Sequence, residues 1–344
     1  MRILFSYLII SLVVLTTACN QHQSKTAHPP ALISAKEAVR LNQLIYKDTI
    51  ERALVKYAPS FEAVFVPQAI NGNYAVIIKD KSADRYALVI RGSVMEFSNE
   101  GFQNFILQDF NIFRIKEWNY ADTVKEAYIS SGAWTGFQNL LQLKDKQTGL
   151  SIKEFIAQKI PAASSIVITG HSLGGNLAYP MAGYLKKELR ADKKLNLQLI
   201  TFGAPAAGNA AFVQDMEEKF PTAERYVGSM DVACMFPDLD KIGEVAKTIG
   251  LDSVLQLGNV SINGMDTKLD VKNLFTIANE VLEKTNVINK TNKYVQSEKH
   301  FRPLLDKNPS VSPVQLTTDA IFDRAYQYHK VDMYAELLGA GLLE

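Results

Sequence analysis

The sequence has few of the features that define several common protein classes. It contains only 2 cysteines among 344 residues, which cannot form a framework of several disulfides. Its 37 lysines and arginines balance 36 aspartates and glutamates, so we expect no nucleic acid as a partner. With 12 prolines, 19 glycines and 47% hydrophobic residues, the chain is neither low-complexity nor collagen-like and can bury a sizeable core.

Motifs for bound cofactors and metals are also missing. No GxGxxG or P-loop pattern occurs, and no group of histidine, cysteine and aspartate residues has metal-ligand spacing. Asp238 and Asp240 alone are weak evidence for calcium. Cys234 has no base at the spacing that a cysteine nucleophile would need, so we expect it to pack in the core. The sequence therefore predicts no cofactor and no metal.

The longest apolar run lies at the N-terminus. Residues 3–15 are too short to span a bilayer but suit the core of a signal peptide. The Thr-Thr-Ala-Cys that follows resembles the bacterial lipoprotein motif, in which Cys19 would be acylated. We expect a signal peptide over 1–18, a lipid-anchored tether over 19–30, and an exported envelope protein held at a membrane surface. The alternative is ordinary cleavage near Ala18, giving a secreted or periplasmic protein.

The remaining chain, 31–344, is expected to form one domain with alternating strands and helices. Two apolar runs, 74–78 and 86–90, flank a polar turn and predict a hairpin. The strands expected after it are 165–169, 195–202 and 225–227, and the helices between them are 177–189 and 210–220. This order is typical of an α/β fold with a mainly parallel central sheet flanked by helices.

Helical spacing of apolar residues also marks three segments outside this alternation. One helix is expected over 33–58, and another over 320–338 at the C-terminus. Residues 241–313 depart from the strand–helix order, and 271–282 within them has clear helical spacing. We therefore expect a mostly helical insertion over 241–313.

The strongest catalytic signal is Gly-His-Ser-Leu-Gly at residues 170–174. It follows a β-branched strand and leads directly into a helix, as a nucleophile elbow requires. Glycines two places before and after Ser172 suit a cramped turn, and the helix start directs N–H groups at a developing oxyanion. The alternative is a glycine-rich turn with a capping serine. A serine nucleophile also needs a general base, and only His300 and His329 follow it in the order expected for such an elbow.

At this point the sequence resembles the class 3, or fungal-type, lipases. Residues 170–175 resemble their elbow, 201–209 are similar to their T-F-G-x-P-x-x-G-N signature, and 91–93 are similar to their R-G-T/S motif. The segment 104–109 and the dipeptide Gly136-Phe137 also match. The resemblance covers about residues 70–240 and implies an α/β-hydrolase fold.

The resemblance also implies the roles of individual residues. Ser172 would be the nucleophile and His329 the base, because a tyrosine follows His329 five residues later, as in the family, whereas His300 lacks one. Asp231 would be the acid, with a proline at plus six. Asp238 and Asp240 remain alternatives for that acid.

Two further features of the site follow from the resemblance. The oxyanion hole would consist of the backbone N–H of Leu173 and of Ser93, whose hydroxyl could also contribute. The aromatic-rich segment 94–113 stands where the family has a lid over an apolar substrate. The alternative is a permanently packed helix.

These features predict a serine hydrolase that cleaves carboxylic esters of lipids through an acyl-enzyme. Its partners would then be a lipid or ester substrate and, through Cys19, the membrane surface. A phospholipase or a short-chain esterase would use the same residues. An inactive surface lipoprotein that uses the hydrolase scaffold for binding is the non-enzymatic alternative.

Overall fold

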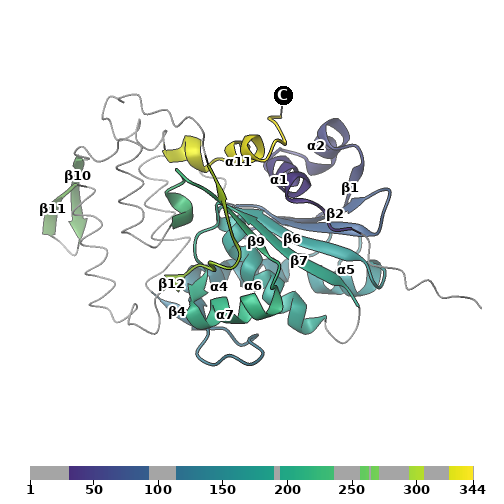
Figure 1. Ribbon diagram of the computed structural model, residues 1–344, viewed down its shortest axis with the longest axis horizontal. Helices are drawn as coiled ribbons and strands as arrows, with labels where there is room; N and C mark the ends of the chain where they lie inside the picture. Colours follow the sequence, from purple (N-terminus) through teal and green to yellow (C-terminus); the bar gives the residue numbers. More distant parts are fainter. Residues whose placement is uncertain are drawn as a thin grey trace, which may run out of the picture.

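The computed structural model describes residues 31–92, 114–189, 194–235, 256–262, 265–270, 294–305 and 325–343. The expected signal peptide and tether, with Cys19, lie outside these residues, as do Ser93 and the expected lid. The described part of the chain has three layers, in which a seven-stranded sheet lies between two layers of helices (Figure 1). None of its helices is long and apolar enough to cross a bilayer.

The central sheet has the strand order β1-β2-β3-β6-β7-β9-β13. Its strands are β1 (Phe61–Phe65), β2 (Ala75–Asp80), β3 (Arg85–Ile90), β6 (Ser165–His171), β7 (Asn196–Phe202), β9 (Glu224–Gly228) and β13 (Phe301–Leu304). β1, β2 and β3 pair antiparallel, and all later neighbours are parallel. The predicted hairpin and the mainly parallel sheet are therefore confirmed. Every residue of β6 is buried, which explains why residues 166–168 are consecutive apolar residues and do not alternate with polar ones.

Helices cover both faces of this sheet. One layer contains α1 (Ala35–Leu44), α2 (Ile50–Tyr57) and α11 (Val331–Leu337), and the other contains α4 (Ser131–Gln142), α5 (Ile152–Lys159), α6 (Leu173–Glu188) and α7 (Ala210–Lys219). Each layer has its own apolar cluster against the strands. Since the parallel strands all end at one edge, the loops at that edge bring distant parts of the chain together.

The single helix expected over 33–58 is wrong, because this segment forms the two helices α1 and α2. α1 begins with a capping box between Ser34 and Glu37 and ends at Leu44. The polar turn that follows ends at Thr49, which is the N-cap of α2. Apolar residues continue across this break at helical spacing because both helices pack on the same sheet, so periodicity alone does not reveal the turn.

The expectation of a mostly helical insertion over 241–313 is wrong where the structure describes it. β10 (Gln256–Ile262) and β11 (Met265–Asp270) form an antiparallel hairpin, and β13 is the edge strand of the central sheet. β12 (Tyr294–Val295) pairs with β8 (Gly208–Asn209) in a small sheet that also contains β5 (Tyr128–Ser130) and β4 (Ile115–Glu117). Charged residues alternate with Met265, Thr267 and Leu269 along β11, a period-2 pattern that is typical of a strand. The segment 271–282 lies outside the described residues.

The C-terminal helix expected over 320–338 is interrupted. Residues 325–329 form one helical turn, and α11 begins at Val331. The break falls directly after His329, so this histidine lies at the end of the short turn. Residues 320–324 are outside the described part of the chain.

Candidate active site

Ser172 occupies the turn between β6 and α6 in a strained backbone conformation. Its φ is 58° and its ψ −129°, a region that costs a non-glycine residue about 1–3 kcal/mol. A Cβ on Gly170 would lie 2.2 Å from the carbonyl of Gly174, and a Cβ on Gly174 would lie 2.2 Å from the carbonyl oxygen of Ile90. Both positions therefore require glycine, and the turn has the geometry of a nucleophile elbow.

Three predicted side chains meet at this turn. The Nε2 atom of His329 lies 2.7 Å from Oγ of Ser172, and its Nδ1 atom lies 2.8 Å from Oδ2 of Asp231. Their exposed fractions are 6% for Ser172, 2% for His329 and 0% for Asp231. His329 follows Asp231 by 98 positions and Ser172 by 157, so only the fold brings the three together.

The order of these contacts determines the chemistry that the site can perform. A carboxylate accepts hydrogen bonds, so Asp231 favours the tautomer of His329 that carries its proton on Nδ1. The lone pair of Nε2 then faces the hydroxyl of Ser172 and can accept its proton. This is the arrangement of a Ser-His-Asp triad.

Asp231 has further donors that hold its carboxylate in place. The hydroxyl of Tyr334 donates to Oδ2 at 2.6 Å, and the backbone N–H groups of Ala233 and Cys234 reach Oδ1 at 2.9 and 3.4 Å. The N–H of Gly228 in turn donates to the Tyr334 hydroxyl at 3.1 Å. Burial first, and the Asp231 charge second, raise the pKa of Tyr334 well above its ordinary value, so the hydroxyl stays protonated. The sequence identified Tyr334 only as a family marker and not as a ligand of the acid.

The alternative base is not at the elbow. His300 is fully buried just before β13, where its ring stacks on Tyr179 at 6.5 Å between centroids. Burial lowers the pKa of His300. No hydrogen bond joins the described side chains of His300 and Ser172, so the structure brings His329 and not His300 to the serine. The alternative acids Asp238 and Asp240 lie outside the described residues.

One expected oxyanion donor, the backbone N–H of Leu173, belongs to the residue directly after the serine. Leu173 is the first residue of α6, and an N–H group at that position has no acceptor within its own helix. Ser93 lies outside the described residues, but Gly92 precedes it. A Cβ on Gly92 would lie 2.6 Å from the carbonyl oxygen of His171 and 3.3 Å from Cβ of Ser172. The segment that leads to Ser93 thus leaves β3 next to the elbow.

The expected packing of Cys234 is confirmed. Its thiol is buried and donates to the backbone oxygen of Asp231 at 3.0 Å. Burial and the nearby Asp231 carboxylate raise the pKa of the thiol well above its ordinary value, so the side chain is neutral. Among the described residues, no group of three or more histidine, cysteine and acidic side chains could hold a metal ion.

The parallel sheet, the strained serine after β6 and the helical layers on both faces define an α/β-hydrolase fold. Comparison of sequences agrees with this class. Residues 88–241 match the family described as lipase (class 3), and the resemblance expected from the motifs is confirmed over that segment.

Two relatives match parts of the chain in sequence. A lipase of Caenorhabditis elegans, ZK262.3, is 34% identical over 100 residues, which are 29% of this chain and 28% of that protein. A chloroplastic phospholipase A1-Igamma2 of Arabidopsis thaliana is 37% identical over 79 residues, which are 22% and 15% of the two chains. The chain thus spans less than a third of either relative.

A solved structure, that of M37 lipase, extends the likeness in fold to most of the chain. The two share a TM-score of 0.62 and 21% identity, over 89% of this chain and 92% of that one. At this identity the likeness defines the fold.

Proposed function

We propose that this protein hydrolyses carboxylic ester bonds of lipids through an acyl-enzyme on Ser172. The observation that carries the proposal is the continuous hydrogen-bonded array from Ser172 through His329 to Asp231. A serine hydroxyl is a weak nucleophile, and this array supplies the base that removes its proton and the carboxylate that orients the base.

The reaction takes two steps. Oγ of Ser172 attacks the ester carbonyl while its proton passes to Nε2 of His329, and the N–H of Leu173 binds the resulting oxyanion together with Ser93. The proton then moves from His329 to the departing alcohol, which leaves an acyl ester on Ser172. Water attacks this ester, His329 takes its proton, and the acid leaves as Oγ is protonated again.

Lipid esters are the proposed substrates because the chain resembles class 3 lipases over 88–241. A phospholipase is the second candidate, since a relative named phospholipase A1 matches part of the chain. Triacylglycerol emulsions, phospholipid vesicles and p-nitrophenyl esters of graded chain length separate the possibilities. Turnover of only acetate and butyrate esters would contradict both and indicate a short-chain esterase.

Covalent labelling with a fluorophosphonate tests whether the site is catalytic at all. We expect wild-type protein and a Ser60→Ala control, changed at an exposed serine, to be labelled. Ser172→Ala should lose both the label and ester hydrolysis. An unlabelled wild-type protein that binds lipid without turnover would instead support the inactive binding scaffold.

We also propose that the protein is exported and anchored to a membrane by acyl chains on Cys19. The supporting feature is the apolar run followed by Thr-Thr-Ala-Cys in the sequence. Metabolic labelling with palmitate should mark the wild type and a Cys234→Ala control, which changes the other cysteine. Cys19→Ala should lose the label and leave the membrane fraction. Unchanged membrane partition in Cys19→Ala would refute the anchor.

A further inference from the structure

We propose that Tyr46 and His171 are positioning residues for the reaction, and that together they connect the backbone of His329 to the start of the oxyanion loop. This inference rests on the hydrolase function proposed above. It concerns a second set of hydrogen bonds, separate from the one that runs through Asp231, and it involves two side chains to which the sequence assigned no role.

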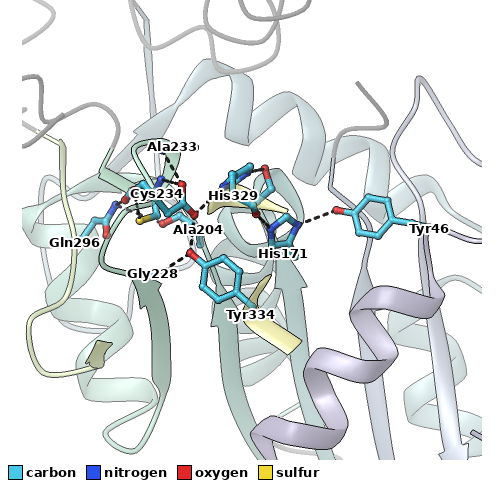
Figure 2. A network of polar contacts seen from close by, with 11 residues as sticks. Tyr46, His171, Ala204, Gly228, Ala233, Cys234, Gln296, His329 and Tyr334 are labelled. Atoms are coloured by element: carbon cyan, nitrogen blue, oxygen red, sulfur yellow. Dashed lines mark hydrogen bonds and ion pairs between the residues drawn. The ribbon is translucent and has the colours of Figure 1, made fainter. Parts of the chain in front are cut away.

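The first link joins the elbow to the base. Nε2 of His171 lies 2.6 Å from the backbone carbonyl oxygen of His329, and the two imidazole centroids are 4.9 Å apart (Figure 2). His329 is the last residue of the helical turn 325–329. The carbonyls at the C-terminal end of a helix have no N–H partner within the helix and need a donor from outside it. His171, the residue directly before Ser172, provides that donor.

The second link joins His171 to the end of β3. The hydroxyl of Tyr46, just after α1, lies 3.3 Å from Nδ1 of His171, and the backbone N–H of Gly92 donates to the same hydroxyl at 3.1 Å. A Cβ on Gly92 would approach the Tyr46 hydroxyl to 2.5 Å. The contact therefore depends on glycine at the position directly before Ser93.

The two ends of this chain determine the direction of every hydrogen bond. The N–H of Gly92 can only donate, and the carbonyl of His329 can only accept. Tyr46 therefore accepts from Gly92 and donates to Nδ1 of His171, whose proton resides on Nε2 and points to His329. A neutral His171 with this one tautomer satisfies all four groups.

The surroundings of His171 keep its ring neutral. Burial first, and the neighbouring His329 second, lower the pKa of His171 well below its ordinary value. The phenols of Tyr46 and Tyr334 lie beside these hydrogen bonds, and burial, the largest cause, raises the pKa of both above the ordinary value. The charge of Arg91 acts on the pKa of Tyr46 in the opposite direction, and Tyr326 acts in the same direction as burial. When His329 takes the proton of Ser172, its positive charge thus faces neutral rings on this side.

The hydrogen bonds through Tyr46 and His171 couple two parts of the site that must be aligned for the same chemical step. A shift of the His329 backbone would move Nε2 away from Ser172, and a shift of Gly92 would move the segment that leads to Ser93. Small displacements of this kind reduce the rate of the chemical step more than the binding of substrate. We therefore expect the loss of either side chain to lower kcat and leave KM nearly unchanged.

Tyr46→Phe tests the link without changing the shape of the side chain. We expect kcat for a p-nitrophenyl ester to fall about tenfold, as for loss of one buried hydrogen bond, with KM within about twofold. Tyr57→Phe, at the end of α2, is the matched control and should behave as the wild type. A kcat within about twofold of wild type in folded Tyr46→Phe would overturn the proposal.

Two amides at position 171 provide a second test that does not depend on Tyr46→Phe folding. A glutamine amide extends about as far as Nε2, and an asparagine amide about as far as Nδ1. His171→Gln should therefore keep several-fold more activity than His171→Asn. Equal losses in the two variants would indicate a packing role only and contradict the proposal.

The double variant Tyr46→Phe/His171→Asn completes the test. Because both changes interrupt one chain, its kcat should match that of His171→Asn alone, whereas independent roles would multiply the losses. Hydrolysis and fluorophosphonate labelling of the wild type are measured alongside. An inactive, unlabelled wild type would refute the proposed function, whereas an active wild type with multiplicative losses would refute only the Tyr46–His171 link.

Discussion

Replacement of the acid by its amide, Asp231→Asn, distinguishes a tautomer-setting role from a purely structural one. Both carboxylate oxygens of Asp231 accept hydrogen bonds, Oδ2 from His329 and Tyr334 and Oδ1 from the N–H groups of Ala233 and Cys234. An asparagine has one oxygen and one NH2 group. In either orientation its NH2 group would therefore face groups that now donate.

The hydrogen-bond partners of Oδ1 and Oδ2 differ in whether they can change from donor to acceptor. Backbone N–H groups cannot become acceptors, and each one left unpaired when buried costs about 1–3 kcal/mol. The NH2 group should therefore replace Oδ2, where Tyr334 can rotate its hydroxyl and His329 can change tautomer. Nδ1 would then accept, and the proton on Nε2 would point at Ser172. A base in that state cannot take the serine proton.

The expected loss in kcat for Asp231→Asn is about 10,000-fold, the scale observed when a triad histidine is held in the wrong tautomer. That corresponds to about 5.4 kcal/mol of transition-state stabilisation. The assay is stopped-flow hydrolysis of a p-nitrophenyl ester, with ¹⁵N NMR of the histidines to locate the proton on His329. Asp84→Asn, at an exposed carboxylate, is the control. A folded Asp231→Asn variant whose kcat stays within tenfold of the wild type would refute this role of Asp231.

Three further predictions follow from the buried groups around the site and in the core. Tyr334→Phe leaves Gly228 N–H unpaired and should lower the free energy of unfolding by about 1–3 kcal/mol, measured by urea denaturation, with a far smaller loss of kcat than Asp231→Asn. The thiol of Cys234 is buried and protonated, so a thiol reagent should modify it only after unfolding; rapid reaction of the native protein would contradict this. Burial alone would raise the pKa of Asp145, but hydrogen bonds from Val66 and the Thr148 turn outweigh burial and lower it. The stability that this carboxylate contributes is present above its unfolded pKa of about 3.9 and is lost as pH falls through the lower folded value, so the Tm difference between wild type and Asp145→Asn should be large at pH 7 and shrink below about pH 4.

The sequence correctly predicted those elements whose residue pattern follows from their own burial and from the turns beside them. β6 is a β-branched run because both of its faces are buried, and the elbow after it is marked by Gly170 and Gly174, which have no room for a Cβ. The hairpin of β2 and β3 was predicted for a similar reason, since a polar turn separates two apolar runs.

Elements that depend on tertiary pairing were predicted less well. The break between α1 and α2 was missed because both helices bury their apolar sides against one sheet. β13 was missed because its four residues become a strand only by pairing with β9. The alternation along β11 was a usable signal, and period-2 counting over 265–270 would have found that strand.

The site shows the same division between short-range and long-range information. The order of residues along the chain left two histidines open as the base. The family resemblance favoured His329 and Asp231, with Asp238 and Asp240 as alternatives for the acid. The resemblance marked Tyr334 beside His329 but not its contact with Asp231, which lies 103 positions away. Neither spacing nor resemblance pointed to Tyr46, which lies 125 positions from His171. Hydrogen bonds across such separations depend on the completed fold.

The glycines of the motifs explain why the site could be located before its supports were known. Gly203, in the T-F-G signature, has a φ of +56°, and a Cβ there would lie 2.9 Å from both Oδ2 of Asp231 and the hydroxyl of Tyr334. Gly92, in the R-G-S motif, has the same relation to Tyr46. In both cases the motif has a glycine because a polar side chain from elsewhere in the sequence occupies the space that a Cβ would need. A motif glycine at such a point therefore indicates that a hydrogen-bonded side chain crosses over it, and the structure identifies that side chain.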